Sequence, residues 1–199
     1  HNLSIAAGYK QVHRPTISLP LGVLSMAANI RAKLWPGDIE IYDARLSGKI
    51  TNLPNGDIVF GDLDAEIERR IRDSNPDVIA ISNMFSWQIS NAFQMAKIAK
   101  KACPNSIVVI GGPHASSFPE ETLKEPGIDY VIMGEGEERF YKFLLAIENK
   151  EEVAIQGVIG KIEDKKLLKP NKKVPIDFIQ NLDSLPLPAY DMVDVDRYM

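Results

Sequence analysis

The sequence contains a single cysteine, Cys103, in 199 residues. One thiol excludes an internal disulfide and any cysteine-ligated zinc or iron–sulfur site within this chain, and it is compatible with a reducing cytoplasm. No apolar run approaches the roughly 20 residues of a membrane span, and no secretory signal is present. The net charge is −4 without a basic run. We therefore expect a cytoplasmic protein that does not bind nucleic acid.

Two nucleotide-binding signatures are also missing. No Gly-x-Gly-x-x-Gly follows the first apolar run, and no Gly-x-x-x-x-Gly-Lys-Ser/Thr occurs in the chain. These loops hold the phosphates of dinucleotides and of nucleoside triphosphates, so nicotinamide chemistry and phosphoryl transfer are disfavoured. A flavodoxin-type flavin site is disfavoured too, because the first loop, 8–19, is neither short nor rich in Ser, Thr and Gly.

Apolar runs and amphipathic stretches alternate along the first 150 residues. The runs that predict strands are 3–7, 38–42, 77–82, 107–110 and 128–133. The stretches with helical spacing follow Pro20, Asp62, Ser86, Pro119 and Glu137. Such alternation is typical of parallel crossovers with helices on both sheet faces. We predict an α/β, flavodoxin-like (Rossmann-like) domain over 1–150, with a five-stranded parallel sheet in the order 2-1-3-4-5.

The last 49 residues break this alternation. Segment 151–175 predicts an exposed β-hairpin that turns at Glu163-Asp164. Segment 176–199 is acidic and carries Pro186 and Pro188, which favours an extended linker toward another domain. We interpret the chain, which begins at His1 rather than Met, as a fragment of a longer protein.

Small and polar residues follow three predicted strands where each strand ends. Ser82-Asn83 stand at the end of the third, Gly111-Gly112 follow the fourth and the Gly-Glu-Gly of 134–136 follows the fifth. Ligands of open α/β sheets bind outside the carboxyl ends of strands, so we expect one site there. Paired glycines allow a ligand to lie against bare main chain. Taken singly, each motif could also have a purely structural role at a strand end of this fold.

Taken together, the motifs resemble a known family. They are Pro20-Leu-Gly-Val-Leu24, Asp38–Asp43, Asp77–Ser82, Val109-Ile-Gly-Gly-Pro-His-Ala-Ser116, Ile128–Glu137 and Leu182–Asp191. In this order they resemble the amino-terminal cobalamin-binding domain of the cobalamin-dependent radical S-adenosylmethionine enzymes. That family includes methyltransferases and anaerobic magnesium-protoporphyrin ester cyclases. The resemblance extends over nearly the whole chain.

The resemblance implies that this chain binds cobalamin, with the nucleotide tail in the sheet edge and the corrin above it. The residues implied in cofactor binding are Tyr9, Leu21, Gly22, Ser82, Asn83, Met84, Phe85, Gly111, Gly112, Pro113, His114, Gly134, Glu135 and Gly136. Phe85 and Trp87 are expected either to flank the corrin or to pack a helix. A side chain at Gly112 is expected to block the tail and to leave the fold intact.

The chemistry itself is expected outside this chain. The family's Cys-x-x-x-Cys-x-x-Cys motif, which holds a 4Fe–4S cluster that cleaves S-adenosylmethionine, is absent here. The resemblance therefore implies a downstream radical domain of the same chain as partner, a parent methyltransferase or cyclase, and an inactive fragment. The alternative is a non-catalytic flavodoxin-like sensor or partner-binding module with a degenerate cofactor site.

No histidine is expected on cobalt. Other cobalamin proteins carry Asp-x-His-x-x-Gly after the first strand, whereas Asp43–Gly48 follows the second and has Arg45 in the histidine position. A guanidinium has no lone pair for a metal, so we interpret this spacing as coincidence. His13 and His114 lie in no ligand motif.

Overall fold

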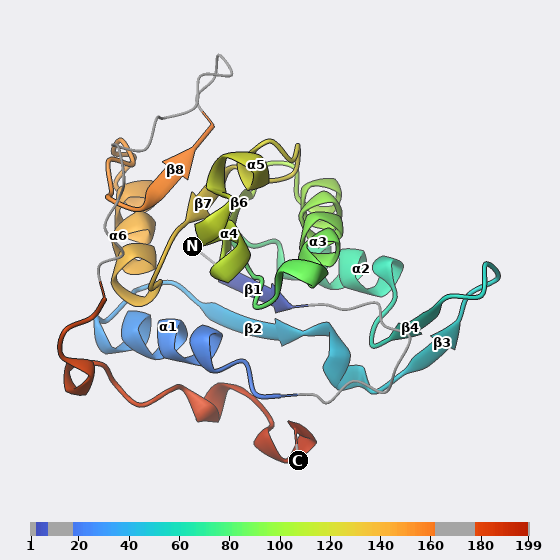
Figure 1. The fold of residues 1–199 in the computed structure, drawn as a ribbon. Helices are drawn as coiled ribbons and strands as arrows, with labels where there is room; N and C mark the ends of the chain where they lie inside the picture. Colours follow the sequence, from blue (N-terminus) through green and yellow to red (C-terminus); the bar gives the residue numbers. More distant parts are fainter. Residues whose placement is uncertain (1–2, 8–17, 162–177, 199) are drawn as a thin grey trace.

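The computed structural model describes residues 3–7, 18–161 and 178–198, and of 3–7 the backbone alone (Figure 1). Its middle layer is a six-stranded sheet in the order β2-β1-β5-β6-β7-β8. The strands are β1 Leu3–Ala7, β2 Ile39–Asp43, β5 Val78–Ser82, β6 Ile107–Gly111, β7 Tyr130–Ile132 and β8 Val158–Gly160. The strands β1, β2, β5, β6 and β7 are parallel, and β8 is antiparallel to β7. When these five parallel strands are numbered 1 to 5 along the chain, their order in the sheet is 2-1-3-4-5.

Helices cover both faces of the sheet (Figure 1). They are α1 Leu21–Ala32, α2 Asp64–Ser74, α3 Ile89–Ala102, α4 Pro113–Ser117, α5 Pro119–Leu123 and α6 Glu137–Glu148. Successive residues of β5 point to opposite faces: Ile79 and Ile81 pack among α2 to α5, whereas Val78 and Ala80 pack among α1 and α6. Burial on both faces is the reason that β5 and β6 are nearly continuous apolar runs. No helix within the described residues has the length and apolar content of a membrane span.

The predicted number of five strands was wrong, and the first arm of the predicted hairpin is not exposed. The first arm of that hairpin joins the sheet as β8, where Val158 and Ile159 are buried at 7% and 2% exposure. Ile159 pairs with Val131, so β8 covers the edge of β7 that would otherwise be open. The second arm and the turn at Glu163-Asp164 lie outside the described residues.

A small unit projects from the carboxyl end of β2 (Figure 1). It consists of the 3-10 turn η1 Ala44–Ser47 and the antiparallel strands β3 Ile50–Asn52 and β4 Ile58–Phe60. Within it, the guanidinium of Arg45 donates two hydrogen bonds, of 2.9 and 2.7 Å, to the carboxylate of Asp43. Both residues are buried, and the Asp43 carboxylate also accepts the Arg45 backbone N–H. The Asp43–Gly48 spacing thus has a local structural explanation.

The segment 178–198, which we call the C-terminal strap, lies along α1 (Figure 1). Ala189 packs on Ala27 and Ala28, whose small side chains permit the close approach, and its N–H donates to the Leu24 carbonyl at 3.2 Å. Asp191 pairs with Arg31 at 2.7 Å. At the far end the Tyr198 hydroxyl lies 3.4 Å from Asp43. Burial, with the charge of Asp43, raises the pKa of Tyr198 to about 12. That the strap leads to another domain stays a prediction.

Candidate functional site

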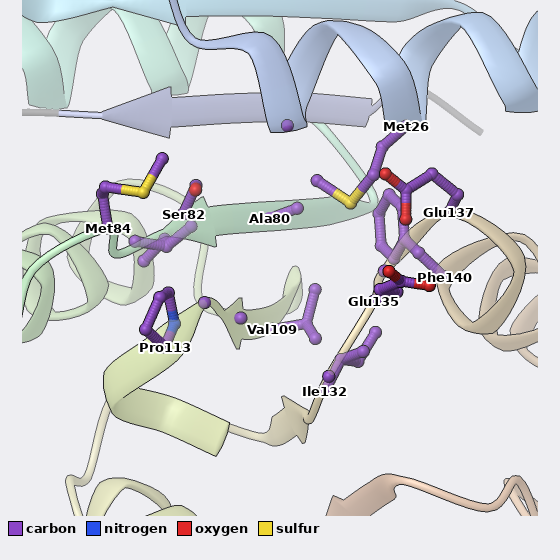
Figure 2. A pocket seen from close by; sticks show the side chains of 16 residues that line it. Met26, Ala80, Ser82, Met84, Val109, Pro113, Ile132, Glu135, Glu137 and Phe140 are labelled. Atoms are coloured by element: carbon purple, nitrogen blue, oxygen red, sulfur yellow. The ribbon is translucent and has the colours of Figure 1, made fainter. Parts of the chain in front are cut away.

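A cavity of about 230 Å³ lies at the carboxyl ends of β5, β6 and β7, on the face covered by α1 and α6 (Figure 2). Its floor consists of side chains that the strand register places side by side. Ala80 is opposite Val109, Ser82 is opposite Gly111, and Gly111 is opposite Ile132. The space exists because Ala80 and Gly111 have little or no side chain.

The walls of the cavity come from α1 and α6. Gly22 and Met26 of α1 lie on one side, and a Cβ added at Gly22 would meet no atom within 4 Å. Glu137 and Phe140 of α6 close one end, near Glu135, while Met84 and Pro113 stand at the other end (Figure 2). The cavity is therefore a slot between the sheet and two helices.

The two glycine turns at the edge have backbone conformations that favour glycine. Gly112 has φ +115° and Gly134 has φ +70°. The Ser116 hydroxyl joins the two turns, because it donates to the Gly112 carbonyl at 2.9 Å and accepts the Gly134 N–H at 2.9 Å. The short helix α4, which the sequence analysis did not predict, places Ser116 between them.

The turn after β7 is backed by the buried side chain of Arg139. Its guanidinium donates to the carbonyls of Met133, Glu135 and Gln156 at 3.0, 3.1 and 3.0 Å. A Cβ on Gly134 would lie 2.7 Å from the same guanidinium. Arg139 thereby fixes the 134–136 turn, which forms one end of the cavity.

Among the residues that the structure describes, the polar side chains of the lining are Ser82, Glu135 and Glu137, and no Lys, Arg or His belongs to it. The Glu135 carboxylate accepts the backbone N–H of Ile179 at the start of the C-terminal strap. This contact joins the cavity to the closing segment of the chain. Within the described residues no three His, Cys, Asp or Glu are grouped as metal ligands would be.

The structure brings together most of the residues predicted for the site. Those that line the cavity are Gly22, Ser82, Met84, Gly111, Gly112, Pro113, Gly134, Glu135 and Gly136. Leu21 and Phe85 lie outside the lining and are half exposed, and Tyr9 and His13 lie outside the described residues. Asn83 is buried beneath the turn, and its backbone N–H donates a hydrogen bond to the Gly111 carbonyl at 3.0 Å. His114 also lies outside the lining, its ring against Phe118 at 5.2 Å.

Several lining residues were missed by the sequence analysis. They are Met26, Ala80, Ile81, Val109, Ile132, Glu137 and Phe140. The sequence did contain a signal for Ala80. Residues two apart in a strand lie on the same face, so Ala80 is expected on the face of the predicted site residue Ser82. The helix residues required the packing of α1 on α6, which the strand-end motifs do not contain.

Comparison with known families decides what kind of domain this is. Residues 13–144 match the B12 binding domain family. The chain belongs to this family. This B12-binding domain is 33% identical over 184 residues to an uncharacterized methyltransferase of Pyrococcus horikoshii, covering 92% of the chain and 36% of that protein. It is 28% identical over 183 residues to the anaerobic magnesium-protoporphyrin IX monomethyl ester cyclase of Synechocystis, covering 90% of the chain and 32% of the relative.

A solved structure shares the fold of the B12-binding domain. It is the cobalamin-dependent S-adenosylmethionine radical enzyme OxsB with aqua-cobalamin and S-adenosylmethionine bound, which superposes with a TM-score of 0.70 at 18% identity. The superposition covers 99% of this chain and 25% of OxsB. The chain thus spans about a third of the length of these curated relatives. The resemblance inferred from the sequence motifs is confirmed.

A side chain added at each of the two edge glycines should affect stability very differently. A Cβ at Gly112 would lie 2.1 Å from the Asn83 carbonyl oxygen, whereas one at Gly111 would meet only the Ile132 carbonyl at 3.5 Å. The expectation that a side chain at Gly112 leaves the fold intact was therefore wrong. We expect Gly112→Ala to lower the free energy of unfolding by about 3 kcal/mol, through a main-chain clash and a disfavoured φ. Urea denaturation measures this, with Gly111→Ala as a control that changes stability by under about 1 kcal/mol. Equal losses in the two variants would contradict this account of the turn.

Proposed function

We propose that this domain binds cobalamin at the carboxyl edge of its sheet and presents the corrin to a radical S-adenosylmethionine domain farther along the same chain. The observation that carries the proposal is the slot of about 230 Å³, which opens at that edge between two glycine turns. The parent protein would be a methyltransferase or a cyclase, as its relatives are named. The 4Fe–4S cluster and S-adenosylmethionine would be held outside this chain, and a cytoplasmic location is expected from its single cysteine.

The size of the slot supports insertion of part of the cofactor. Pockets that enclose whole small molecules measure about 300–1,000 Å³. A cavity of about 230 Å³ is below that range, which fits the nucleotide end of cobalamin and leaves the corrin outside. When bound, cobalamin supplies a cobalt centre for group transfer.

The residues of the chain would hold the tail by shape and by a few polar contacts. Ser82 would donate its hydroxyl to the base, and the bare main chain of Gly111 and Gly112 would let the tail pass. The 134–136 turn would face the ribose and phosphate. There the Gly134 amide is already bonded to Ser116, so the amides that follow it would be the donors.

Exposed apolar side chains at the same edge favour the binding of a large ligand above the slot. Met84, Phe85 and Trp87, which follow β5, are 51%, 50% and 60% exposed, and Leu21 at the start of α1 is 50% exposed. The Phe85 and Trp87 rings stack at 6.0 Å. A corrin would cover such a surface, and so would a protein partner, which keeps the partner-binding module as the second candidate.

A binding experiment separates the two candidates. We expect the 199-residue chain to bind hydroxocobalamin or methylcobalamin, to retain the corrin absorbance through gel filtration, and to leave S-adenosylmethionine unconsumed. Absorbance titration and a turnover assay measure both. An unchanged corrin spectrum with no retained cofactor, at high protein concentration, would favour the partner-binding module.

A bulky residue at Gly22 should block the slot without harming the fold. Because a Cβ there meets nothing within 4 Å, we expect Gly22→Leu to fill the slot and to weaken cobalamin binding about tenfold or more. Stability should not fall, since leucine is the better helix former by about 0.8 kcal/mol. Ala32→Leu, at the exposed end of the same helix, is the matched control and should bind as wild type does. Unchanged affinity in Gly22→Leu would show that the tail does not enter this slot.

A further inference from the structure

The C-terminal strap contacts the slot at a residue of the slot lining. The backbone N–H of Ile179, near the start of the strap, donates a hydrogen bond to the carboxylate of Glu135. Glu135 belongs to the 134–136 turn, which forms one end of the slot. The end of the slot and the start of the strap therefore share a hydrogen bond, although 44 positions separate the two residues in the chain.

The strap also rests on α1, the helix that forms one wall of the slot (Figure 1). Ala189 is buried at 5% exposure, where it packs on Ala27 and Ala28. Its N–H donates to the Leu24 carbonyl at 3.2 Å. Met26, which lines the slot, belongs to the same stretch of helix. The strap thus contacts two of the elements that enclose the slot.

Few buried contacts hold the strap in place. Among residues 178–198 only Ala189 is buried. The ion pair of Asp191 with Arg31 joins side chains that are half exposed or more, and pairs of this kind contribute little to stability. A segment held in this way opens locally at a small cost in free energy. A ligand that interacts differently with the docked and the open strap can therefore shift this equilibrium.

A ligand at the 134–136 turn and the docked strap act on the same carboxylate. In the docked state the Ile179 N–H holds Glu135, so the turn is restrained before a ligand arrives and loses less conformational entropy on binding. The phosphate proposed to lie at this turn is anionic, and the N–H donor offsets part of the negative charge of Glu135 that the phosphate would meet. Both effects make the docked state the tighter binder.

We propose that the C-terminal strap is a conformational coupling element, in which occupancy of the slot strengthens strap docking, and docking strengthens binding, through the Glu135–Ile179 hydrogen bond. The inference rests on the proposed function, because cobalamin is the ligand assigned to the slot. It adds regulation to that function. The segment that leads toward the proposed radical domain would be held most firmly when the cofactor is in place, with Glu135 as a positioning residue.

Hydrogen exchange at strap amides measures docking directly. The amides of Ile179 and Ala189 are hydrogen-bonded in the docked state, so their exchange rates report how often the strap opens. We expect saturating hydroxocobalamin to slow both rates about tenfold in the 199-residue chain, since couplings between sites are typically roughly 5- to 150-fold. The Gly56 amide, bonded to the Leu53 carbonyl in the projecting β3–β4 unit, should keep its rate.

A variant that loosens the strap without changing the slot tests the reverse effect. The leucine side chain in Ala189→Leu is too large for the close contact with Ala27 and Ala28, so we expect the strap to undock. Because linkage is reciprocal, the cobalamin dissociation constant should rise by the factor by which exchange slows in wild type, about tenfold. Ser184→Leu adds similar bulk at an exposed position of the strap and is the matched control with wild-type affinity.

Glu135→Ala tests whether the effect passes through this carboxylate. In this background cobalamin should no longer slow exchange of the Ala189 amide, and adding Ala189→Leu should no longer change the dissociation constant. Glu138→Ala is the matched control, because it removes a carboxylate that pairs with Lys33 at 2.8 Å and lies outside the lining. Both effects should persist in Glu138→Ala.

The outcomes separate this inference from the function on which it rests. Cobalamin binding with unchanged exchange at Ile179 and Ala189 would overturn the inference and leave the proposed function intact. So would wild-type affinity in an Ala189→Leu chain whose strap amides exchange freely, or persistence of both effects in Glu135→Ala. Where Ala189→Leu leaves these amides protected, Ala189→Arg provides the same comparison. Failure of the wild-type chain to bind cobalamin would count against the proposed function itself.

Discussion

The buried guanidinium of Arg139 holds together three stretches of main chain that meet at the site. It donates to carbonyls at the end of β7, in the 134–136 turn and just before β8. Gly134 and Gly157 lack a Cβ where the guanidinium passes, at 2.7 and 2.6 Å from the position a Cβ would take. The end of the slot, the start of α6 and the antiparallel return of β8 therefore depend on one side chain. Buried carbonyls left without such a donor would each cost about 1–3 kcal/mol.

The parallel core could be predicted from the sequence because its signals are local. Runs such as Ile107–Gly111 are apolar on both faces, and Pro, Gly and Asn residues mark where helices begin and end. The strand β8 could not be predicted in this way. It has only three residues, and its position depends on pairing with the edge of β7, which is a long-range contact. The C-terminal strap is similar, since its contacts with α1 come from residues more than 150 positions away in the chain.

The site was predictable at its rim and less so in its interior. Glycines and short polar residues at strand ends are visible as motifs, and most of them line the slot. The interior depends on which face each strand residue takes and on how α1 and α6 pack, so Met26 and Phe140 carried no signal in the motifs. Gly112 shows a further limit. The sequence indicated a close approach at this glycine, but the group that approaches it is the Asn83 main chain of the protein itself.

Methionine side chains offer the most direct test of the central claim, that the nucleotide end of cobalamin enters the slot. Met26 and Met84 line the slot, whereas Met95 is buried at 3% exposure among the residues on the opposite face of the sheet. In a chain labelled at methionine methyl groups, with signals assigned by single Met→Leu variants, cobalamin should shift the Met26 and Met84 resonances and leave that of Met95 in place. Retained cobalamin with an unchanged Met26 resonance would contradict the account, because the cofactor would then be bound elsewhere on the domain.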